Sequence, residues 1–143
     1  MKKYRIAFAT GSRADYGIMR RYLDLLNQDS DVQLDILATG ALLSDKFGHQ
    51  VDLIYQDGFN VATQIDLPLD FSSNVKVLNT MAVAMNKFAE YFGNNKPDLL
   101  IILGDRYEML SVAISASMQK IPIFSEKFFI DKRYFLYENL AKG

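Results

Sequence analysis

The chain of 143 residues has no cysteine and only one histidine, His49. The lack of cysteine excludes disulfides, thiolate catalysis and cysteine-based zinc sites, and it is compatible with a reducing compartment. A single histidine leaves too few of the usual nitrogen ligands for a transition-metal site. We therefore expect neither a metal ion nor a cofactor.

An excess of charge of one sign is also lacking. The 16 lysines and arginines nearly balance the 17 aspartates and glutamates, which leaves a formal charge of -1. This balance does not favour binding to nucleic acid or to an anionic membrane, so any anion site must be local.

Long apolar runs are missing as well. None approaches the roughly 20 residues that a membrane helix needs. The apolar stretch behind the basic start ends at Thr10, which is too early for a secretory signal. The expected location is the cytoplasm.

What is present is an alternation of short apolar segments with helical patterns. The segments typical of strands lie at 5–10, 32–39, 60–67, 99–103 and 121–123. Apolar residues at helical spacing predict helices over 15–26, 47–55, 75–92 and 109–120. Strands joined through helices imply a parallel sheet covered on both faces. The predicted fold class is therefore α/β, with a doubly wound, Rossmann-like parallel sheet.

The third predicted helix is the longest, and its apolar residues recur three and four positions apart, as in a packed helix. The positions expected to face the core are Val75, Leu78, Ala82, Met85, Ala89 and Phe92. Packing explains this stripe better than a cofactor site would.

The alternation of strands and helices stops after Ile123. Residues 124–143 mix aromatic and charged side chains without continuing the pattern. We therefore divide the chain into an incomplete Rossmann-like domain at 1–123 and a divergent tail at 124–143. The aromatic tail would pack over the sheet edge or mediate self-association, so a homo-oligomer is one expectation.

Ligands of an open parallel sheet bind at the carboxyl ends of its strands. The first loop there, Gly-Ser-Arg-Ala-Asp-Tyr-Gly at 11–17, precedes a helix N-terminus, where free N–H groups favour an anion. Arg13 can grip a phosphate with two parallel hydrogen bonds. An alternative of equal weight is a helix cap, in which Ser12 or Asp15 accepts from N–H groups and Arg13 is solvated.

A second charged loop, Gly-Asp-Arg-Tyr-Glu at 104–108, follows the most apolar strand. Asp105 could act as a general base, since partial burial raises the pKa of a carboxyl group, and Arg106 could bind phosphate. The alternative, again of equal weight, is an N-cap aspartate with Glu108 in a favourable acidic first turn. A third loop, at 40–44, carries no ionisable group and is interpreted as structural.

The two charged loops, together with Phe47-Gly48, Asp57-Gly58-Phe59 and Ile121-Pro122-Ile123, resemble in their order and spacing a known enzyme family. It is that of the hydrolysing UDP-N-acetylglucosamine 2-epimerases of sialic acid and capsule biosynthesis. The resemblance covers roughly residues 3–123. It implies a glycosyltransferase-B-type architecture, in which two facing Rossmann-like domains hold a UDP-sugar between them and this chain is the N-terminal one. The implied reaction eliminates UDP to give a glycal and then adds water to yield N-acetylmannosamine.

Carried over position by position, the resemblance assigns residues to the site. Asp105 matches an acid that transfers a proton. The substrate-binding or UDP-binding set is Gly11, Ser12, Arg13, Gly17 and Arg106. Asp15 and Glu108 are further candidates. Proton removal from C2 needs a base, and a departing diphosphate needs positive charge nearby, so these residue types suit the reaction.

Two departures from the family pattern limit this expectation. The loop after the second strand reads Gly-Ala-Leu-Leu at 40–43, without the family's histidine in Gly-x-His-Leu. After Ile123 the chain reads Phe-Ser-Glu instead of continuing to His-x-x-Gly-Gly-Glu. Because the second domain is missing from the sequence, we expect a truncated or frameshifted product that does not turn over alone. A non-catalytic nucleotide-binding or interaction module, and an unrelated flavodoxin-like regulatory domain, remain alternatives.

Overall fold

The computed structural model describes residues 3–104 and 106–125. The strands are β1 (Tyr4–Thr10), β2 (Val32–Thr39), β3 (Val61–Ile65), β4 (Leu99–Ile102) and β5 (Ile123–Ser125). The helices are α1 (Arg13–Gln28), α2 (Val51–Gln56), α3 (Asn74–Asn94) and α4 (Tyr107–Ser117), with 3-10 turns η1 (Gly40–Leu43) and η2 (Asp45–Phe47) after β2. Strands and helices therefore alternate as the apolar pattern predicted.

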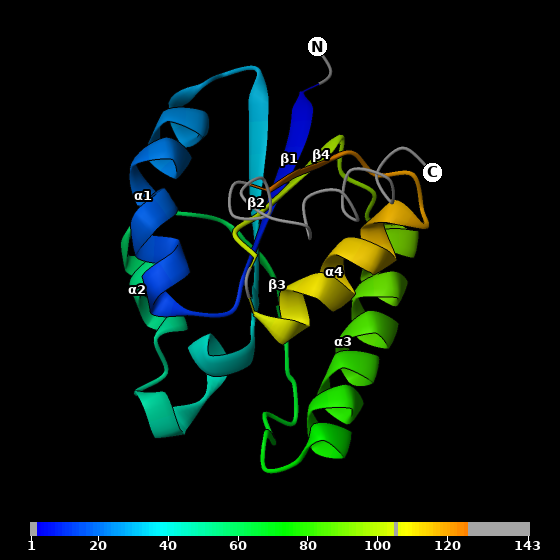
Figure 1. Cartoon of the computed structure of the whole chain (residues 1–143). Helices are drawn as coiled ribbons and strands as arrows, with labels where there is room; N and C mark the ends of the chain where they lie inside the picture. The colour runs from blue at the N-terminus through cyan, green and yellow to red at the C-terminus, as the bar shows by residue number, and fades with distance from the viewer. Residues whose placement is uncertain (1–2, 105, 126–143) are drawn as a thin grey trace.

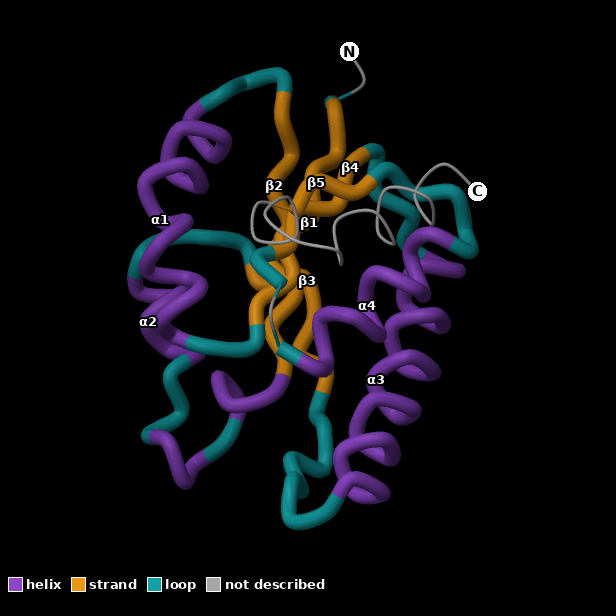
Figure 2. The backbone as a smooth tube through the Cα atoms, viewed as in Figure 1, coloured by secondary structure: helices purple, strands orange, loops and turns teal. Residues whose placement is uncertain are grey.

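The described strands form one parallel sheet in the order β3-β2-β1-β4-β5. α1 and α2 cover one face and α3 and α4 the other (Figures 1 and 2). The predicted α/β class with a doubly wound sheet is confirmed. The chain winds outward from β1 to β3 and then crosses back to β4, so the carboxyl ends of β1 and β4 flank the switch in strand order where ligands of such sheets bind.

The strand β1 shows how the two helical layers are held. Ile6 and Phe8 point toward the core under α1, whereas Ala7 and Ala9 belong to the core under α3 and α4. Because successive side chains of a strand face opposite ways, a strand buried on both faces must be apolar throughout. This arrangement explains why the segment reads as a continuous apolar run.

The face of α3 differs from the one predicted. Its buried residues are Thr80, Ala84, Phe88 and Phe92, four apart. Val75 and Leu78 are instead 73% and 62% exposed. Of the predicted core positions only Phe92 is fully buried. The spacing indicated a helix correctly, but α3 carries apolar residues on two sides, and spacing alone does not say which side meets the sheet.

Two boundaries were also placed wrongly. The helix expected over 47–55 begins only at Val51, because Gly48 and His49 take positive φ angles of 82° and 50° and separate it from η2. The last strand, expected to open at Ile121, begins at Ile123 and runs to Ser125, since the N–H of Ile121 still bonds to the carbonyl of Ala116. The division at residue 123 stays a prediction, because residues 126–143 lie outside the described part. Over the described ranges, no helix is long and apolar enough to cross a membrane.

Candidate functional site

Three loops meet at the carboxyl edge of the sheet around the side chain of Glu108. Gly11, directly after β1, lies so close that a Cβ atom there would be 2.9 Å from Oε1 of Glu108. Gly40, directly after β2, has a φ of +61°, and its Cβ would lie 3.4 Å from the carbonyl oxygen of Gly11. Only glycine fits both positions without displacing its neighbours. The loops after β1, β2 and β4 are therefore packed as one unit.

Glu108 fixes the arginine of its own loop. It lies in the first turn of α4 and is 1% exposed, and its Oε1 accepts a hydrogen bond of 2.7 Å from Nε of Arg106. The Arg106 side chain remains 37% exposed. A charge-assisted bond to a buried partner restricts the guanidinium strongly. The carboxylate thus anchors one end of Arg106, whose side chain is partly exposed beside the cavity.

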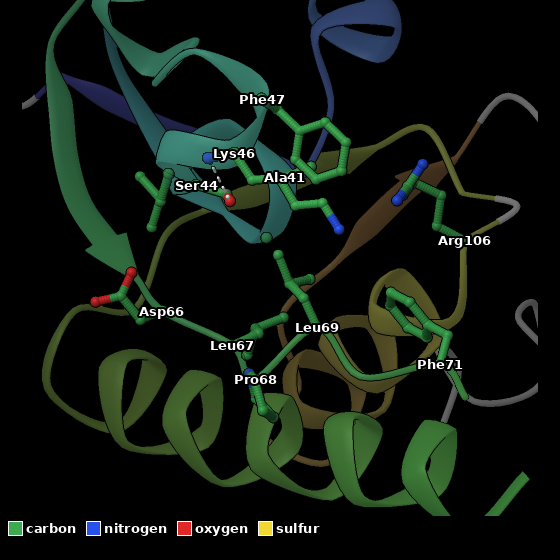
Figure 3. Close-up of a pocket in the computed structure, with 12 residues that line it drawn as sticks. Ala41, Ser44, Lys46, Phe47, Asp66, Leu67, Pro68, Leu69, Phe71 and Arg106 are labelled. Carbon is green, nitrogen blue, oxygen red and sulfur yellow. Dashed lines mark hydrogen bonds between the residues drawn. The ribbon is translucent and has the colours of Figure 1, made fainter. Parts of the chain in front are cut away.

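A cavity of about 530 Å³ opens beside this arginine. Figure 3 shows Lys46 and Arg106 reaching into it from two different loops. The polar lining is Ser44, Lys46, Asp66 and Arg106, and the larger apolar side chains are Leu43, Phe47, Leu67, Leu69 and Phe71. Lys46 and the outer part of the Arg106 guanidinium offer hydrogen-bond donors to an anionic group, and the apolar walls suit the uncharged part of such a ligand.

The loop after β2, which the sequence led us to interpret as structural, contributes to the lining of the cavity. Ala41, Leu43 and Ser44 line the cavity, and the 3-10 turn η2 that follows brings in Lys46 and Phe47. Residues 40–44 carry no charge, so their role could not be read from ionisable groups. The available signal was Lys46, two positions after Ser44.

The first charged loop, at 11–17, forms a helix cap, which was the alternative to an anion site. Ser12 is the N-cap of α1 and its Oγ accepts from the N–H of Asp15 at 3.2 Å. Asp15 is buried, whereas Arg13 and Gly17 are exposed and lie outside the lining of the cavity at Arg106. The structure thus brings Gly11 to the Arg106 loop but leaves Arg13 on the solvent side of α1. The roles assigned to these residues remain predictions.

The second charged loop is only partly described. Asp105 lies outside the described residues, so its assignment as the proton-transfer acid stays a prediction. The residue at the N-cap position of α4 is Arg106, which makes no side-chain capping bond, and the alternative of a capping aspartate rests on Asp105, outside the described residues. Glu108 does lie in the first turn of α4, as the same alternative predicted. Among residues 3–104 and 106–125, no cluster of three metal-ligating side chains occurs.

Tyr16 ties the first loop to the rest of the α1 layer. Its hydroxyl donates to Oδ2 of Asp57 at 2.5 Å, and Arg20 pairs with Oδ1 of the same carboxylate at 3.1 Å. Burial, followed by the bond to Asp57, raises the pKa of Tyr16 well above its ordinary value. Asp57 follows α2, so this bond holds the start of α1 against the segment that precedes β3.

Comparison with known proteins identifies what this arrangement is similar to. The family model described as UDP-N-acetylglucosamine 2-epimerase matches residues 24–124. Polysialic acid biosynthesis protein P7 of Escherichia coli is 43% identical over 123 residues, which are 86% of this chain and 31% of that protein. The GDP/UDP-N,N'-diacetylbacillosamine 2-epimerase (hydrolyzing) of Campylobacter jejuni is 35% identical over 86% of this chain and 32% of its own length.

A solved structure shares the fold at much lower identity. The UDP-N-acetylglucosamine 2-epimerase of Neisseria meningitidis, bound to UDP-N-acetylglucosamine, superposes with a TM-score of 0.71 at 12% identity. The match covers 96% of this chain and 37% of that one. The chain thus spans about a third of the length of the curated relatives it matches.

Proposed function

Since the chain belongs to the UDP-N-acetylglucosamine 2-epimerase family, we propose that it forms the N-terminal part of a hydrolysing enzyme that converts UDP-N-acetylglucosamine into N-acetylmannosamine and UDP. Family membership rules out the alternative of an unrelated flavodoxin-like regulatory domain. The fold supports the proposal, because a doubly wound α/β domain suits the N-terminal half of a two-domain, glycosyltransferase-B-type enzyme. The proposed location is the cytoplasm, which fits a chain without cysteine.

The observation that carries the proposal is the buried bond between Glu108 and Arg106 at the wall of the cavity. Departure of UDP concentrates negative charge on a diphosphate, and fixed cations stabilise that charge without having to reorganise during the reaction. Arg106 is fixed by Glu108, and Lys46 faces the same space (Figure 3). We assign both cations to the anionic portion of a UDP-sugar.

The proposed reaction has two steps. A base removes the proton at C2 while the C1–O bond to UDP breaks, which leaves a double bond between C1 and C2. Water then adds across that bond, placing hydroxyl at C1 and a proton on the opposite face of C2. Asp105 is the proposed proton-transfer acid. We assign Glu108 to positioning Arg106 instead, because it is 1% exposed and bonded to that arginine.

A second candidate function is a nucleotide-binding module without catalysis. It rests on the same two cations, Lys46 and Arg106, which can hold a diphosphate whether or not a reaction follows. Catalysis in a cleft needs groups held on both sides, and a half-cleft admits water freely. In this case the chain would bind UDP through the same cations without turnover.

Calorimetric titration with UDP and with UDP-N-acetylglucosamine, alongside an assay for N-acetylmannosamine, separates these functions. Arg106→Ala tests the site, and Arg21→Ala, which removes an exposed arginine of α1, is the matched control. Turnover that disappears in Arg106→Ala supports the enzyme. Binding without turnover that is lost only in Arg106→Ala supports the module, and the absence of any UDP binding would refute both.

A further inference from the structure

A smaller cavity, of about 270 Å³, adjoins the cavity at Arg106. Its lining consists of Phe71, Arg106, Tyr107 and Glu108. Phe71 and Arg106 also line the larger cavity, and Figure 3 shows both side chains at the same end of it. The two cavities therefore meet at Arg106, whose side chain borders both spaces. A group bound in the smaller cavity lies next to an anion held at Arg106.

Two aromatic rings form the apolar wall of the smaller cavity. Phe71 comes from the loop between β3 and α3, and Tyr107 is the first residue of α4; their side chains are 42% and 58% exposed. The ring centroids lie 6.1 Å apart, and the ring planes are tilted by 33°. Rings at this distance contact each other directly, so no flat group can insert between them. A ligand must instead lie against the surface that the two rings present together.

The loop that carries Phe71 is fixed by its own backbone and hydrogen bonds. Leu69 has a φ of 49°, in the left-handed region that is costly for a leucine and that persists only where the surroundings hold it. Oδ1 of Asp70 accepts hydrogen bonds from the N–H and the hydroxyl of Ser72, at 3.0 and 2.6 Å. These bonds close a tight turn around Phe71. Because the ring is placed in advance, a ligand loses less free energy to ordering it.

We infer that Phe71 and Tyr107 form the subsite for the hexose ring of a UDP-sugar, an assignment that rests on the proposed function. A pyranose presents C–H bonds on its faces, and the face of an aromatic ring is the negative part of its quadrupole. The weakly positive hydrogens of the sugar are therefore attracted to the rings. Sites for small molecules combine such apolar surfaces with a few polar groups that fix the orientation, and here Arg106 supplies that group.

The position of the rings favours the hexose over the other parts of the ligand. In a UDP-sugar the hexose is bonded directly to the diphosphate, whereas the uracil is separated from it by the ribose. Because Arg106 borders both cavities, the rings lie within reach of a sugar bonded to a diphosphate held there, and not of the base. Tyr107 lies two positions after Asp105, the proposed proton-transfer acid, which has to act on C2 of the hexose. Of the two sugars, the hexose is therefore the one expected on the rings.

Calorimetric titrations with UDP and with UDP-N-acetylglucosamine test this subsite, because only the second ligand carries the hexose. In Tyr107→Ala and in Phe71→Ala we expect affinity for UDP-N-acetylglucosamine to fall roughly three- to tenfold, while affinity for UDP stays unchanged. Tyr107→Phe keeps the ring and should regain most of the affinity lost in Tyr107→Ala. Tyr22→Ala is the matched control, since Tyr22 of α1 is 59% exposed, and it should bind both ligands as the natural chain does. Circular dichroism verifies that the variants fold.

Three other outcomes would contradict the inference, and they differ in what they leave standing. Equal losses for UDP and UDP-N-acetylglucosamine would mean that the rings support the UDP portion, which overturns the inference and leaves the proposed function intact. Unchanged affinity for UDP-N-acetylglucosamine in both ring variants, with binding still lost in Arg106→Ala, would do the same. A natural chain that binds neither ligand would refute the subsite and the proposed function together.

Discussion

Nε of Arg106 donates to Oε1 of Glu108 across 2.7 Å, and that carboxylate is itself almost completely buried between the loops after β1 and β2. Burying a carboxylate costs free energy unless well-placed charged or hydrogen-bonding partners compensate for the lost water. Because the partner of Glu108 is Arg106, the bond that offsets the cost of burial also fixes the guanidinium at the cavity. Glu108 is thus best understood as a positioning residue that acts through Arg106.

Glu108→Gln tests this role. The amide keeps the shape and can still accept from Arg106, but it removes the charge assistance, so we expect a loss of about 1–3 kcal/mol in the free energy of unfolding. Affinity for UDP should fall roughly tenfold, corresponding to ~1.4 kcal/mol. Urea unfolding and calorimetry measure the two effects. Asp52→Asn, which alters an exposed carboxylate, should change neither, and unchanged UDP affinity in Glu108→Gln would contradict the positioning role.

A pair of glycine substitutions tests the packing of the loops. Gly11→Ala would place Cβ 2.9 Å from Oε1 of Glu108, so we expect a destabilisation of about 1–3 kcal/mol and weaker UDP binding. Gly17→Ala has no atom within 4 Å of the new Cβ and lies inside α1, so it should stabilise the domain by about 0.5–1 kcal/mol. Thermal unfolding compares them. Equal effects in the two variants would show that Glu108 and Gly11 are not in close contact.

The raised pKa of Tyr16 predicts a pH dependence of stability at alkaline pH. The folded state resists ionisation of Tyr16, first because it is buried and then because it donates to Asp57, while the unfolded chain ionises near 10. Its contribution to stability should therefore be complete below pH 10 and decline as the pH rises beyond it. The check is the difference in urea midpoint between the natural chain and Tyr16→Phe. That difference should shrink between pH 9 and about 11, and a constant or growing difference would contradict the assignment.

The observed orientation of α3 predicts which of its residues support the core. Phe88 is fully buried against the sheet, so Phe88→Ala should cost about 3–5 kcal/mol. Leu25→Ala, at a position that is 61% exposed on α1, should stay within about 0.5 kcal/mol of the natural chain. Denaturant unfolding at one protein concentration measures both. A small effect at Phe88 would mean that α3 meets the sheet through another face.

The sheet could be predicted from the sequence because its central strands β1, β2 and β4 are largely buried on both faces. Such strands appear as uninterrupted apolar runs, as in Leu99 to Leu103, and the helices between them force a parallel arrangement. The side of α3 that meets the sheet could not be predicted. Thr80 is buried there, its hydroxyl bonded to the carbonyl of Lys76, while apolar residues also occupy the opposite side. Hydrophobic spacing detects a stripe but not its partner.

The candidate site was predictable only in part, for a related reason. The Arg106 loop stood out by its charges, whereas the bond that orients Arg106 joins two residues that had been considered for separate roles. The contribution of the loop after β2 depends on two 3-10 turns that carry Lys46 and Phe47 to the cavity. Such turns have no strong sequence signature. Contact between Gly40 and Gly11, which are 29 positions apart (40 − 11), is set by the sheet and not by local sequence.

The contact of Gly11, Gly40 and Glu108 has a consequence for how this part of the molecule can evolve or be engineered. A substitution in any one of the three loops shifts the atoms against which the other two are fitted, so their effects on ligand preference will be epistatic. A segment grafted from a relative to alter specificity, for example 40–47 alone, would arrive without its matching neighbours. Transplanting the three loops together preserves the fit, so they form the smallest exchangeable unit of this edge.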